Sequence, residues 1–439
     1  MAKNIITALD VGSSKICTII ATISDDNERP QVIGVYNHPS AGVKKGVIVN
    51  IDEATNAIAE SVAAAERMAG ITVSSVYASI GGSHITSINS KGVVAVSHEE
   101  IAEDDTFRAI ENARTISIPP SREILHIIPR EFIVDSQPGI KDPVGMTGSR
   151  LEVNTHIISA TTTALQNLVK CIQQNGLGVE DVVFAGWASS HAVLTETEKD
   201  LGVALLDIGG GTTGISIFQE GAISYSGCIP LGGLSITSDI AIGLQVSLED
   251  AEKIKTHISR IIDNNEKETS EPVERTAMER RTDKGKEKKE KKSKEDLIDI
   301  SKLGIEGKKE ISLTMYQQVV EARMEEIFEM VTDQVSQAGF DVSMPAGVVI
   351  TGGTSQLDEV SKIAQRTFGV PSRVGIPSGL VGMVEEISGP EFSVCQGLVK
   401  YAMSEGVEPG SSGKGFGAVK STAGGIFGKI TGWLKSLLP

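Results

Sequence analysis

The 439-residue sequence lacks the features that are typical of secreted proteins, membrane-spanning proteins and proteins with structural zinc sites. No run approaches the roughly 18 apolar residues of a spanning helix, and no basic and apolar signal regions precede the first strand pattern. The cysteines are few, scattered and without a C-x-x-C pair. They are Cys17, Cys171, Cys228 and Cys395. We therefore expect a chain of the reducing cytoplasm, neither secreted nor membrane-spanning, with no structural zinc and with its cysteines in the core.

A surplus of basic residues is also missing. Asp and Glu number 57 against 41 Lys and Arg, which gives a formal net charge of −16. A nucleic-acid binder neutralises phosphates with a basic face, so this balance argues against nucleic acid as a partner. The length and the 40% hydrophobic content are sufficient for two or more domains with filled cores.

The stretch from Leu205 to Phe218 predicts a strand, a glycine-rich turn and a second strand. Glycines let backbone N–H groups approach an anion, and threonine hydroxyls at the same edge add donors. Asp207 ends the first strand, where it could hold a Mg²⁺ ion carried by phosphates. An ordinary tight hairpin is the alternative. The turn residues are Gly209, Gly210, Gly211, Thr212 and Thr213.

The same pattern occurs a second time, from Thr7 to Ile20, with Asp10 at the end of its first strand. Its turn contains Gly12, Ser13, Ser14 and Lys15. A third element is a buried strand that ends in Gly352, Gly353 and Thr354, where an adenine ring could lie on bare backbone. Two related lobes that clamp one nucleotide would explain all three elements.

These three elements, in this order, resemble the actin/Hsp70/sugar-kinase ATPase superfamily. The resemblance implies that ATP binds to the three turns and that Mg²⁺ binds near Asp10 and Asp207. The fragment from Asp250 to Lys255 resembles a helix of bacterial actins, in which the residues matching Glu252 and Lys255 reach the ribose. Gly233, at the helix start after the second hairpin, is expected to approach the phosphates.

The region 83–159 has short strands and one polar helix, which predicts an inserted α+β subdomain. Its segment from Arg122 to Asp135 resembles the FtsA family of bacterial actin-like division proteins. The resemblance implies that this subdomain contacts the next subunit of a filament. The residues themselves, His126 included, predict only a half-buried strand pair.

Hydrolytic relatives carry a Glu or Gln on the helix that precedes the second lobe, where it orients the attacking water. The matching stretch here is Ser189, Ser190 and His191, and the first carboxylate is Glu196. Since serine is no base at neutral pH, we expect slow hydrolysis at most. A lone histidine is more often a surface or core residue than a catalytic one.

The stretch from Tyr316 to Val335 predicts an amphipathic helix. By the FtsA resemblance, Arg323 and Glu326 on its outer face match positions that bind the C-terminal peptide of FtsZ, while an ordinary solvated face is the alternative. Between 266 and 295 the sequence is almost wholly charged, which favours a solvated loop over a basic partner or lipid contact. Strands are also predicted over 32–36 and 45–49, and a helix over 51–69 that Gly70 ends.

The C-terminal residues 426–439 place their apolar residues on one helical face and their lysines away from it. The pattern predicts an interfacial membrane helix that is too short to span a bilayer, at the end of a glycine-rich tether. A helix that docks on protein is the alternative. The residues expected to meet anionic lipid are Ile426, Phe427, Lys429, Ile430, Trp433, Leu434, Lys435 and Leu437.

We therefore expect an α/β chain with a two-lobed, actin-like (RNase H-like) ATPase fold, an inserted α+β subdomain and a C-terminal amphipathic helix. The expected divisions are first-lobe core at 1–82, 160–199 and 386–403, the insert at 83–159, second-lobe core at 200–240, a smaller second-lobe subdomain at 241–315 that contains the charged run, the second-lobe helix and adenosine-loop region at 316–385, a linker at 404–425 and the membrane helix at 426–439.

The resemblance implies an ATP-binding protein that polymerises on the cytoplasmic membrane and anchors FtsZ filaments at the division septum. Its partners would be the FtsZ C-terminal peptide, further copies of itself and anionic lipids. The alternatives are a turnover ATPase or small-molecule kinase of the same superfamily, or an actin-like anchor for pili or cell shape.

Overall fold

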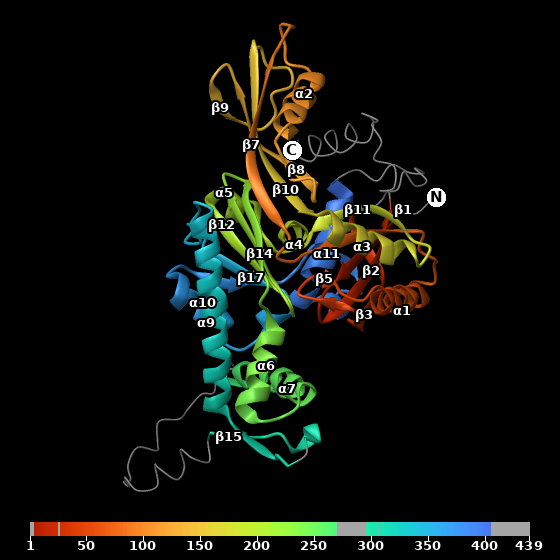
Figure 1. Ribbon diagram of the computed structural model, residues 1–439, viewed down its shortest axis with the longest axis vertical. Helices are drawn as coiled ribbons and strands as arrows, with labels where there is room; N and C mark the ends of the chain where they lie inside the picture. The colour runs from red at the N-terminus through yellow and green to blue at the C-terminus, as the bar shows by residue number, and fades with distance from the viewer. Residues whose placement is uncertain (1–3, 25–26, 270–295, 306, 405–439) are drawn as a thin grey trace.

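The computed structural model describes residues 4–24, 27–269, 296–305 and 307–404. Within them the chain forms two lobes, each built on a β-sheet, and a smaller subdomain that extends from the first lobe (Figure 1). The molecule is elongated, with this subdomain at one end and helices α6 (Gly233–Leu244) and α7 (Leu248–Thr269) at the other. No helix in these ranges combines the length and the hydropathy that crossing a bilayer requires.

The first lobe contains a mixed six-stranded sheet in the order β11-β6-β1-β2-β3-β19. The antiparallel hairpin of β1 and β2 lies at its centre, and β6 runs parallel to β1. The strands are β1 (Asn4–Val11), β2 (Lys15–Ser24), β3 (Asn27–Pro39), β6 (Ser75–Ile80), β11 (Gly178–Phe184) and β19 (Val381–Gly382).

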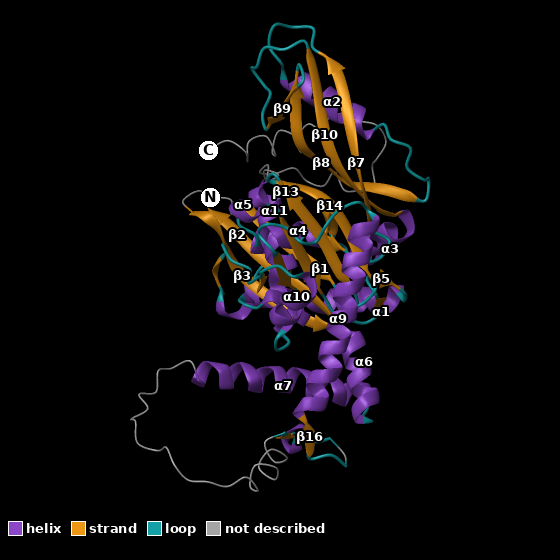
Figure 2. Cartoon of the chain, turned by 90° about the vertical axis from the view of Figure 1, so that its left-hand side faces the viewer, coloured by secondary structure: helices purple, strands orange, loops and turns teal. Residues whose placement is uncertain are grey.

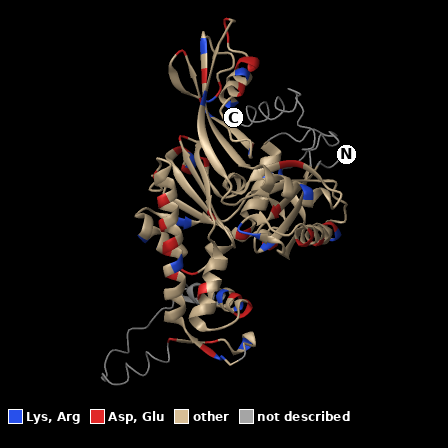
Figure 3. Ribbon diagram, viewed as in Figure 1, with Lys and Arg blue, Asp and Glu red and all other residues tan. Residues whose placement is uncertain are grey.

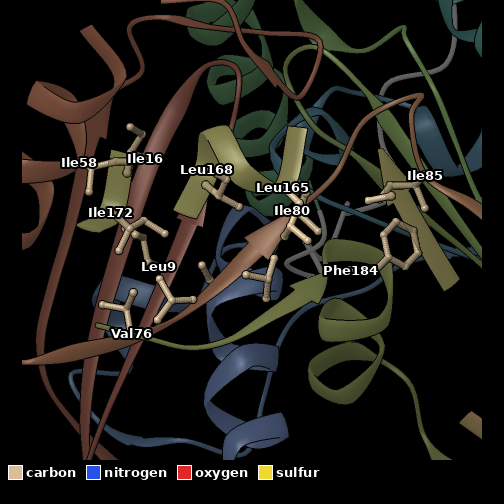
Figure 4. Packing of buried hydrophobic residues seen from close by; sticks show 14 of the residues in the cluster. Leu9, Ile16, Ile58, Val76, Ile80, Ile85, Leu165, Leu168, Ile172 and Phe184 are labelled. Atoms are coloured by element: carbon tan, nitrogen blue, oxygen red, sulfur yellow. The ribbon is translucent and has the colours of Figure 1, made fainter. Parts of the chain in front are cut away.

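Helices cover both faces of this sheet. Leu9 and Ile16 pack with α1 and α3 on one face, whereas Ala8 and Cys17 face α11 on the other. Figure 4 shows the first of these two clusters, in which Leu9 and Ile16 lie close to Ile58 of α1 and Ile172 of α3. Side chains alternate between the faces of a strand, so a strand that is covered on both sides is apolar almost throughout. The helices of this lobe are α1 (Ile51–Ala69), α3 (Thr162–Gln173), α4 (Ala185–Val193), α5 (Glu196–Leu201) and α11 (Ser393–Ser404).

Helix α1 has a local signal at each end. The side chain of Asn50 accepts hydrogen bonds from the backbone N–H groups of Asp52 and Glu53. At the other end Gly70 adopts a left-handed conformation, with φ at 69°, and its N–H donates to Glu66 O. The predicted helix over 51–69 is confirmed with these bounds.

The second lobe contains a five-stranded sheet in the order β14-β13-β12-β17-β18. One face packs against α6, α7, α9 and α10. The other face packs against α4, which lies between the two lobes. The elements are β12 (Val203–Ile208), β13 (Thr213–Gln219), β14 (Ala222–Ile229), β17 (Val348–Thr351), β18 (Ser372–Val374), α9 (Leu313–Gln337) and α10 (Val360–Phe368), with a small hairpin of β15 (Leu297–Asp299) and β16 (Glu310–Ser312) beyond α7.

The subdomain at the top of Figure 1 is a four-stranded antiparallel sheet in the order β7-β10-β8-β9, with one helix against it. Phe132 and Leu151, both fully buried, lie in its own small core with residues of the helix. The elements are β7 (Thr86–Ala95), α2 (Glu103–Arg114), β8 (Arg122–Val134), β9 (Gln137–Ile140) and β10 (Arg150–Thr161).

This subdomain also contacts the second lobe, at the edge strand β14 (Figure 2). The hydroxyl of Ser87 donates to Ser226 O at 2.7 Å and accepts from Ser226 N at 2.9 Å. The side chain of Asn89 donates to Ser224 O at 3.0 Å, and the ring of His156 lies 2.8 Å from Asn89 Oδ1. Side chains thus pair with a sheet edge where a further strand could otherwise bind. We call this set of hydrogen bonds the β14 edge contact.

All four cysteines are buried and unpaired, which confirms their expected place in the core. The thiol of Cys395 in α11 donates to Cys17 O of β2 at 3.3 Å. Burial raises the pKa of the Cys228 thiol to about 12, so this thiol stays protonated at neutral pH.

Candidate functional site

The β1–β2 turn and the β12–β13 turn have the same construction. Gly12 N donates to Lys15 O at 3.0 Å, and Gly209 N donates to Thr212 O at 2.9 Å. Asp10 and Asp207 occupy the next-to-last position of β1 and β12. The two predicted hairpins therefore repeat each other in structure, one in each lobe.

The two turns meet across the space between the lobes. A Cβ atom added to Gly210 would lie 2.7 Å from Ser14 Cβ, and one added to Gly211 would lie 2.7 Å from Ser13 Oγ. Both distances are shorter than a carbon atom tolerates, so side chains there would force the turns apart. The glycines thus allow the lobes to approach each other at this point.

The third predicted turn joins the same site. Gly352, after β17, has a φ of 86°, and a Cβ atom there would lie 2.4 Å from Asp207 Oδ1. The hydroxyl of Thr354 donates to Gly209 O at 2.9 Å, which ties this turn to the β12–β13 turn.

A cleft of about 370 Å³ lies where the three turns meet. Such a volume is within the range of small-molecule sites. Among the predicted residues, those that line it are Asp10, Gly12, Ser13, Ser14, Lys15, Asp207, Gly209, Gly210, Gly211, Thr212, Gly233, Glu252, Lys255, Gly352, Gly353 and Thr354. Thr213 is not among them. It is fully buried, and its hydroxyl donates to Leu231 O at 2.9 Å instead.

Two partly buried carboxyl groups, Asp10 and Asp207, face this cleft. Burial raises the pKa of Asp10, although the hydroxyl of Ser79, which donates to Asp10 Oδ1 at 2.5 Å, and the charge of Lys15 oppose the shift. Burial and the nearby charge of Asp10 raise the pKa of Asp207 from 3.8 to about 7. A pair of this kind is unfavourable when both groups are ionised, unless a cation accompanies them.

Glu252 and Lys255 lie on α7 at the opposite side of the cleft. Lys255 Nζ lies 2.7 Å from Glu252 Oε2 and donates to the hydroxyl of Thr237 at 2.7 Å and to Gly233 O at 3.2 Å. The ammonium group is buried and saturated with partners. It therefore fixes α7 against the start of α6, which also orients Gly233.

Several residues that line the cleft were not predicted. Thr256 and Ser259 lie one turn and two turns after Glu252 on α7, so the helical spacing from Glu252 could have indicated them. Residues from distant segments have no such local signal. They include Gly46, Ser79, Gln356, Leu357, Glu391, Ser393 and Val394.

The strand predicted over 45–49 is confirmed only over two residues, 47–48. The chain forms two short strands, β4 (Val43–Lys44) and β5 (Val47–Ile48), and the turn between them reaches the cleft. Gly46 N donates to Ser13 Oγ at 2.9 Å, so this turn holds a residue of the β1–β2 turn in place.

Helix α4 presents no acid or base to the cleft. The hydroxyls of Ser189 and Ser190 donate to carbonyls one turn earlier in the helix, at 3.3 and 2.7 Å. His191 does not line the cleft, and burial lowers its pKa to about 3, which keeps the ring neutral at pH 7. Phe184 and Ala185, just before and at the helix start, line the cleft instead.

Arg323 and Glu326 lie on α9, far from these turns in the sequence and absent from the cleft lining. Arg323 binds Asp239 of α6 through two hydrogen bonds of 2.5 and 2.9 Å and also pairs with Glu326. Charges of both signs follow one another along α9 (Figure 3). The predicted membrane residues of 426–439 lie outside the described residues.

Two family models match the chain. The model for "Cell division protein FtsA" matches residues 204–397, and the model for "SHS2 domain inserted in FTSA" matches residues 82–159. The cell division protein FtsA of Pseudomonas aeruginosa is 34% identical over 414 residues, which cover 94% of this chain and 93% of that protein. The chain belongs to the FtsA family. Within that family, FtsA of Borreliella burgdorferi is 37% identical over 403 residues, 91% of each chain. The FtsA resemblance of the Arg122–Asp135 segment is confirmed, and the family's role is cell division.

Solved structures share the fold at low sequence identity. A chain of the PilM-PilN type IV pilus biogenesis complex has a TM-score of 0.59 at 15% identity, covering 92% of this chain and 99% of its own. MreB5 of Spiroplasma citri, solved bound to ADP, has a TM-score of 0.50 at 13% identity, covering 91% and 97%. The two-lobed, actin-like α/β fold expected for this FtsA family member is confirmed.

Proposed function

We propose that this protein binds ATP with Mg²⁺ between its lobes, polymerises on the cytoplasmic face of the membrane and anchors FtsZ filaments at the division septum. One observation carries the nucleotide part of the proposal. Three glycine turns from distant parts of the sequence and two partly buried carboxylates converge on one cleft of about 370 Å³. The shared fold with MreB5, which was solved with ADP, agrees with this role.

The cleft residues suit a nucleotide in a definite orientation. The β1–β2 and β12–β13 turns would bind the phosphates through backbone N–H groups, and α7 with the turn at Gly352 would hold the nucleoside. Asp10 and Asp207 would hold Mg²⁺, and the raised pKa of Asp207 supports a cation between them. When bound, the cation would shield the phosphate charge from these carboxylates.

The surroundings of the cleft favour binding over turnover. A hydrolase needs a group that accepts a proton from the attacking water. The hydroxyls of Ser189 and Ser190 are engaged within α4, and the neighbouring residues that line the cleft, Phe184 and Ala185, have no ionisable group. Bound ATP would therefore persist and favour the closed lobes, and closed lobes would favour filament contacts.

The proposed FtsZ surface lies on the second lobe at the end that α6 and α7 form (Figure 1). Large apolar side chains are exposed there on α6, at the start of α7 and on α9: Ile242 is 74% exposed, Leu248 61% and Met315 40%. Arg323 lies on the same helix as Met315. Apolar anchors beside charged residues suit a short peptide that carries both kinds of side chain.

The membrane part of the proposal depends on the sequence of 426–439. One such helix binds lipid reversibly, so firm attachment would require several subunits of a filament acting together. Assembly and membrane attachment would then strengthen each other.

The proposal is tested with the full-length protein, ATP and Mg²⁺ on anionic vesicles. We expect ATP-dependent filaments on the vesicles, visible by electron microscopy, and an Asp207→Ala variant that neither binds ATP nor assembles. An Asp207→Ala variant that binds ATP and assembles as the wild type does would contradict the nucleotide role.

FtsZ binding is tested with the FtsZ C-terminal peptide. Arg323→Asp should abolish binding, but it also breaks the ion pair with Asp239. The double variant Arg323→Asp with Asp239→Arg is the control, because it restores an ion pair between α6 and α9 in reverse. If the arginine itself contacts the peptide, the double variant folds as the wild type does and still fails to bind. Recovered binding would assign Arg323 a purely structural role.

A further inference from the structure

A further chain segment reaches the cleft, just before and at the start of α11. It consists of a single turn of 3₁₀ helix, Pro390–Phe392, followed directly by Ser393. Glu391, Ser393 and Val394 line the cleft. Pro390 O accepts a hydrogen bond from Gly352 N at 3.2 Å, which fixes this segment against the turn that follows β17.

The segment holds the ammonium group of Lys15. Lys15 Nζ donates to Glu391 O at 2.7 Å and lies 4.5 Å from the centre of the Phe392 ring. A carbonyl oxygen and an aromatic face both attract a cation without neutralising it. The side chain of Lys15 is therefore held in one place while its charge stays available to an anion.

Ser393 has a buried hydroxyl for which the described residues offer no partner. The residue is 1% exposed, it lines the cleft, and its Oγ makes no hydrogen bond with any described residue. Buried hydroxyls are nearly always paired, so a lone one that borders a cleft calls for a partner from outside the chain.

Two features beside Ser393 favour an anion as that partner. Ser393 begins the 12-residue helix α11, whose first turn carries a partial positive charge. The carboxylate of Glu391, the nearest acidic group along the chain, is turned to Gln356, whose amide donates to it at 2.6 Å. The positive end of α11 and the ammonium group of Lys15 would thus both attract an anion that binds beside Ser393.

We propose that the segment from Glu391 to Ser393 is an additional nucleotide-contacting element, in which the Ser393 hydroxyl donates a hydrogen bond to a phosphate oxygen beside Lys15. This inference rests on the proposed nucleotide binding and adds a phosphate contact to it. Because the same segment continues into α11, it joins the cleft to the last helix of the described residues.

The test compares Ser393→Ala with Ser224→Ala in the full-length protein. Ser224 is a matched control, since it is also 1% exposed with an unpaired hydroxyl but does not line the cleft. Affinities for ATP, ADP and adenosine are measured by competition with a fluorescent ATP analogue. Hydrogen bonds to charged groups imply about a tenfold or larger loss of ATP and ADP affinity in Ser393→Ala, with adenosine unchanged.

The Ser224→Ala variant should bind all three ligands as the wild type does, and Ser393→Thr, which keeps a hydroxyl, should retain most ATP affinity. If Ser393→Ala does not fold, Ser393→Cys replaces it. The inference is overturned if the variant without the hydroxyl binds ATP normally, or if it loses adenosine as strongly as ATP. A wild-type protein that binds none of the ligands would overturn the proposed function as well, so the two failures are distinct.

Discussion

The β14 edge contact holds the inserted subdomain against the second lobe, so its loss should lower the free energy of local opening at β14. Replacing both Ser87 and Asn89 by alanine removes the side chains that pair with the N–H and C=O of Ser226 and the C=O of Ser224. Each backbone group left unpaired in a buried place costs about 1–3 kcal/mol, and water that enters the contact recovers part of this. We therefore expect the local opening free energy at β14 to fall by about 1–2 kcal/mol, which is a factor of about 5–30 in the open population.

Amide hydrogen exchange measures this opening directly. The N–H of Ser226, which donates to the Ser87 hydroxyl, should exchange about 5–30 times faster in the double variant than in the wild type. Ser90→Ala is the matched control, because the Ser90 hydroxyl lies on the same strand but donates to Ala113 O inside the subdomain, at 2.7 Å. Exchange at β14 that stays unchanged in the double variant, or that rises equally in Ser90→Ala, would refute the contact.

Three further results are expected. Gly352→Ala should abolish ATP binding and lower the Tm more than Gly176→Ala, because both positions have a positive φ but an added Cβ atom meets Asp207 Oδ1 at 2.4 Å only at Gly352; equal losses would contradict the close approach. The pKa of Asp207 is about 7 in the folded protein, compared with the ordinary value of 3.8 that applies to the unfolded chain. The protein without nucleotide should therefore lose stability as the pH rises between these two values, and Mg²⁺-ATP should raise the Tm more above pH 7 than below it. Asp207→Asn should lack this dependence, and a variant that keeps it would exclude Asp207 as the cause. Trp433→Glu should prevent pelleting with anionic vesicles whereas Ser436→Glu, on the polar side of the predicted helix, should not; unchanged pelleting of the first variant would defeat the membrane assignment.

The three glycine turns could be predicted because each is local in sequence. Each turn follows a strand pattern and contains glycines, and two of the three also have an acidic residue within a few positions. These short patterns identify both the turn and its chemistry. That the turns occur in both halves of the chain also indicated two lobes. The structure brings together the residues of these turns because parallel pairs, β1 with β6 and β12 with β17, direct them to one edge of each sheet.

Other parts of the site could not be predicted because their positions depend on the whole fold. The turn at Gly46 and the segment from Glu391 to Ser393 reach the cleft from distant parts of the chain, without a pattern of their own. Thr213 shows a different limit. It is the first residue of β13, and which side of a strand a residue faces depends on where the turn ends, which composition does not reveal.

The burial of every cysteine has a practical consequence for following this molecule at work. A thiol-reactive dye will find no ready native target on the surface, so one cysteine introduced at an exposed position such as Ser83 can be labelled selectively. Fluorescence from that position would report movements of the subdomain during assembly.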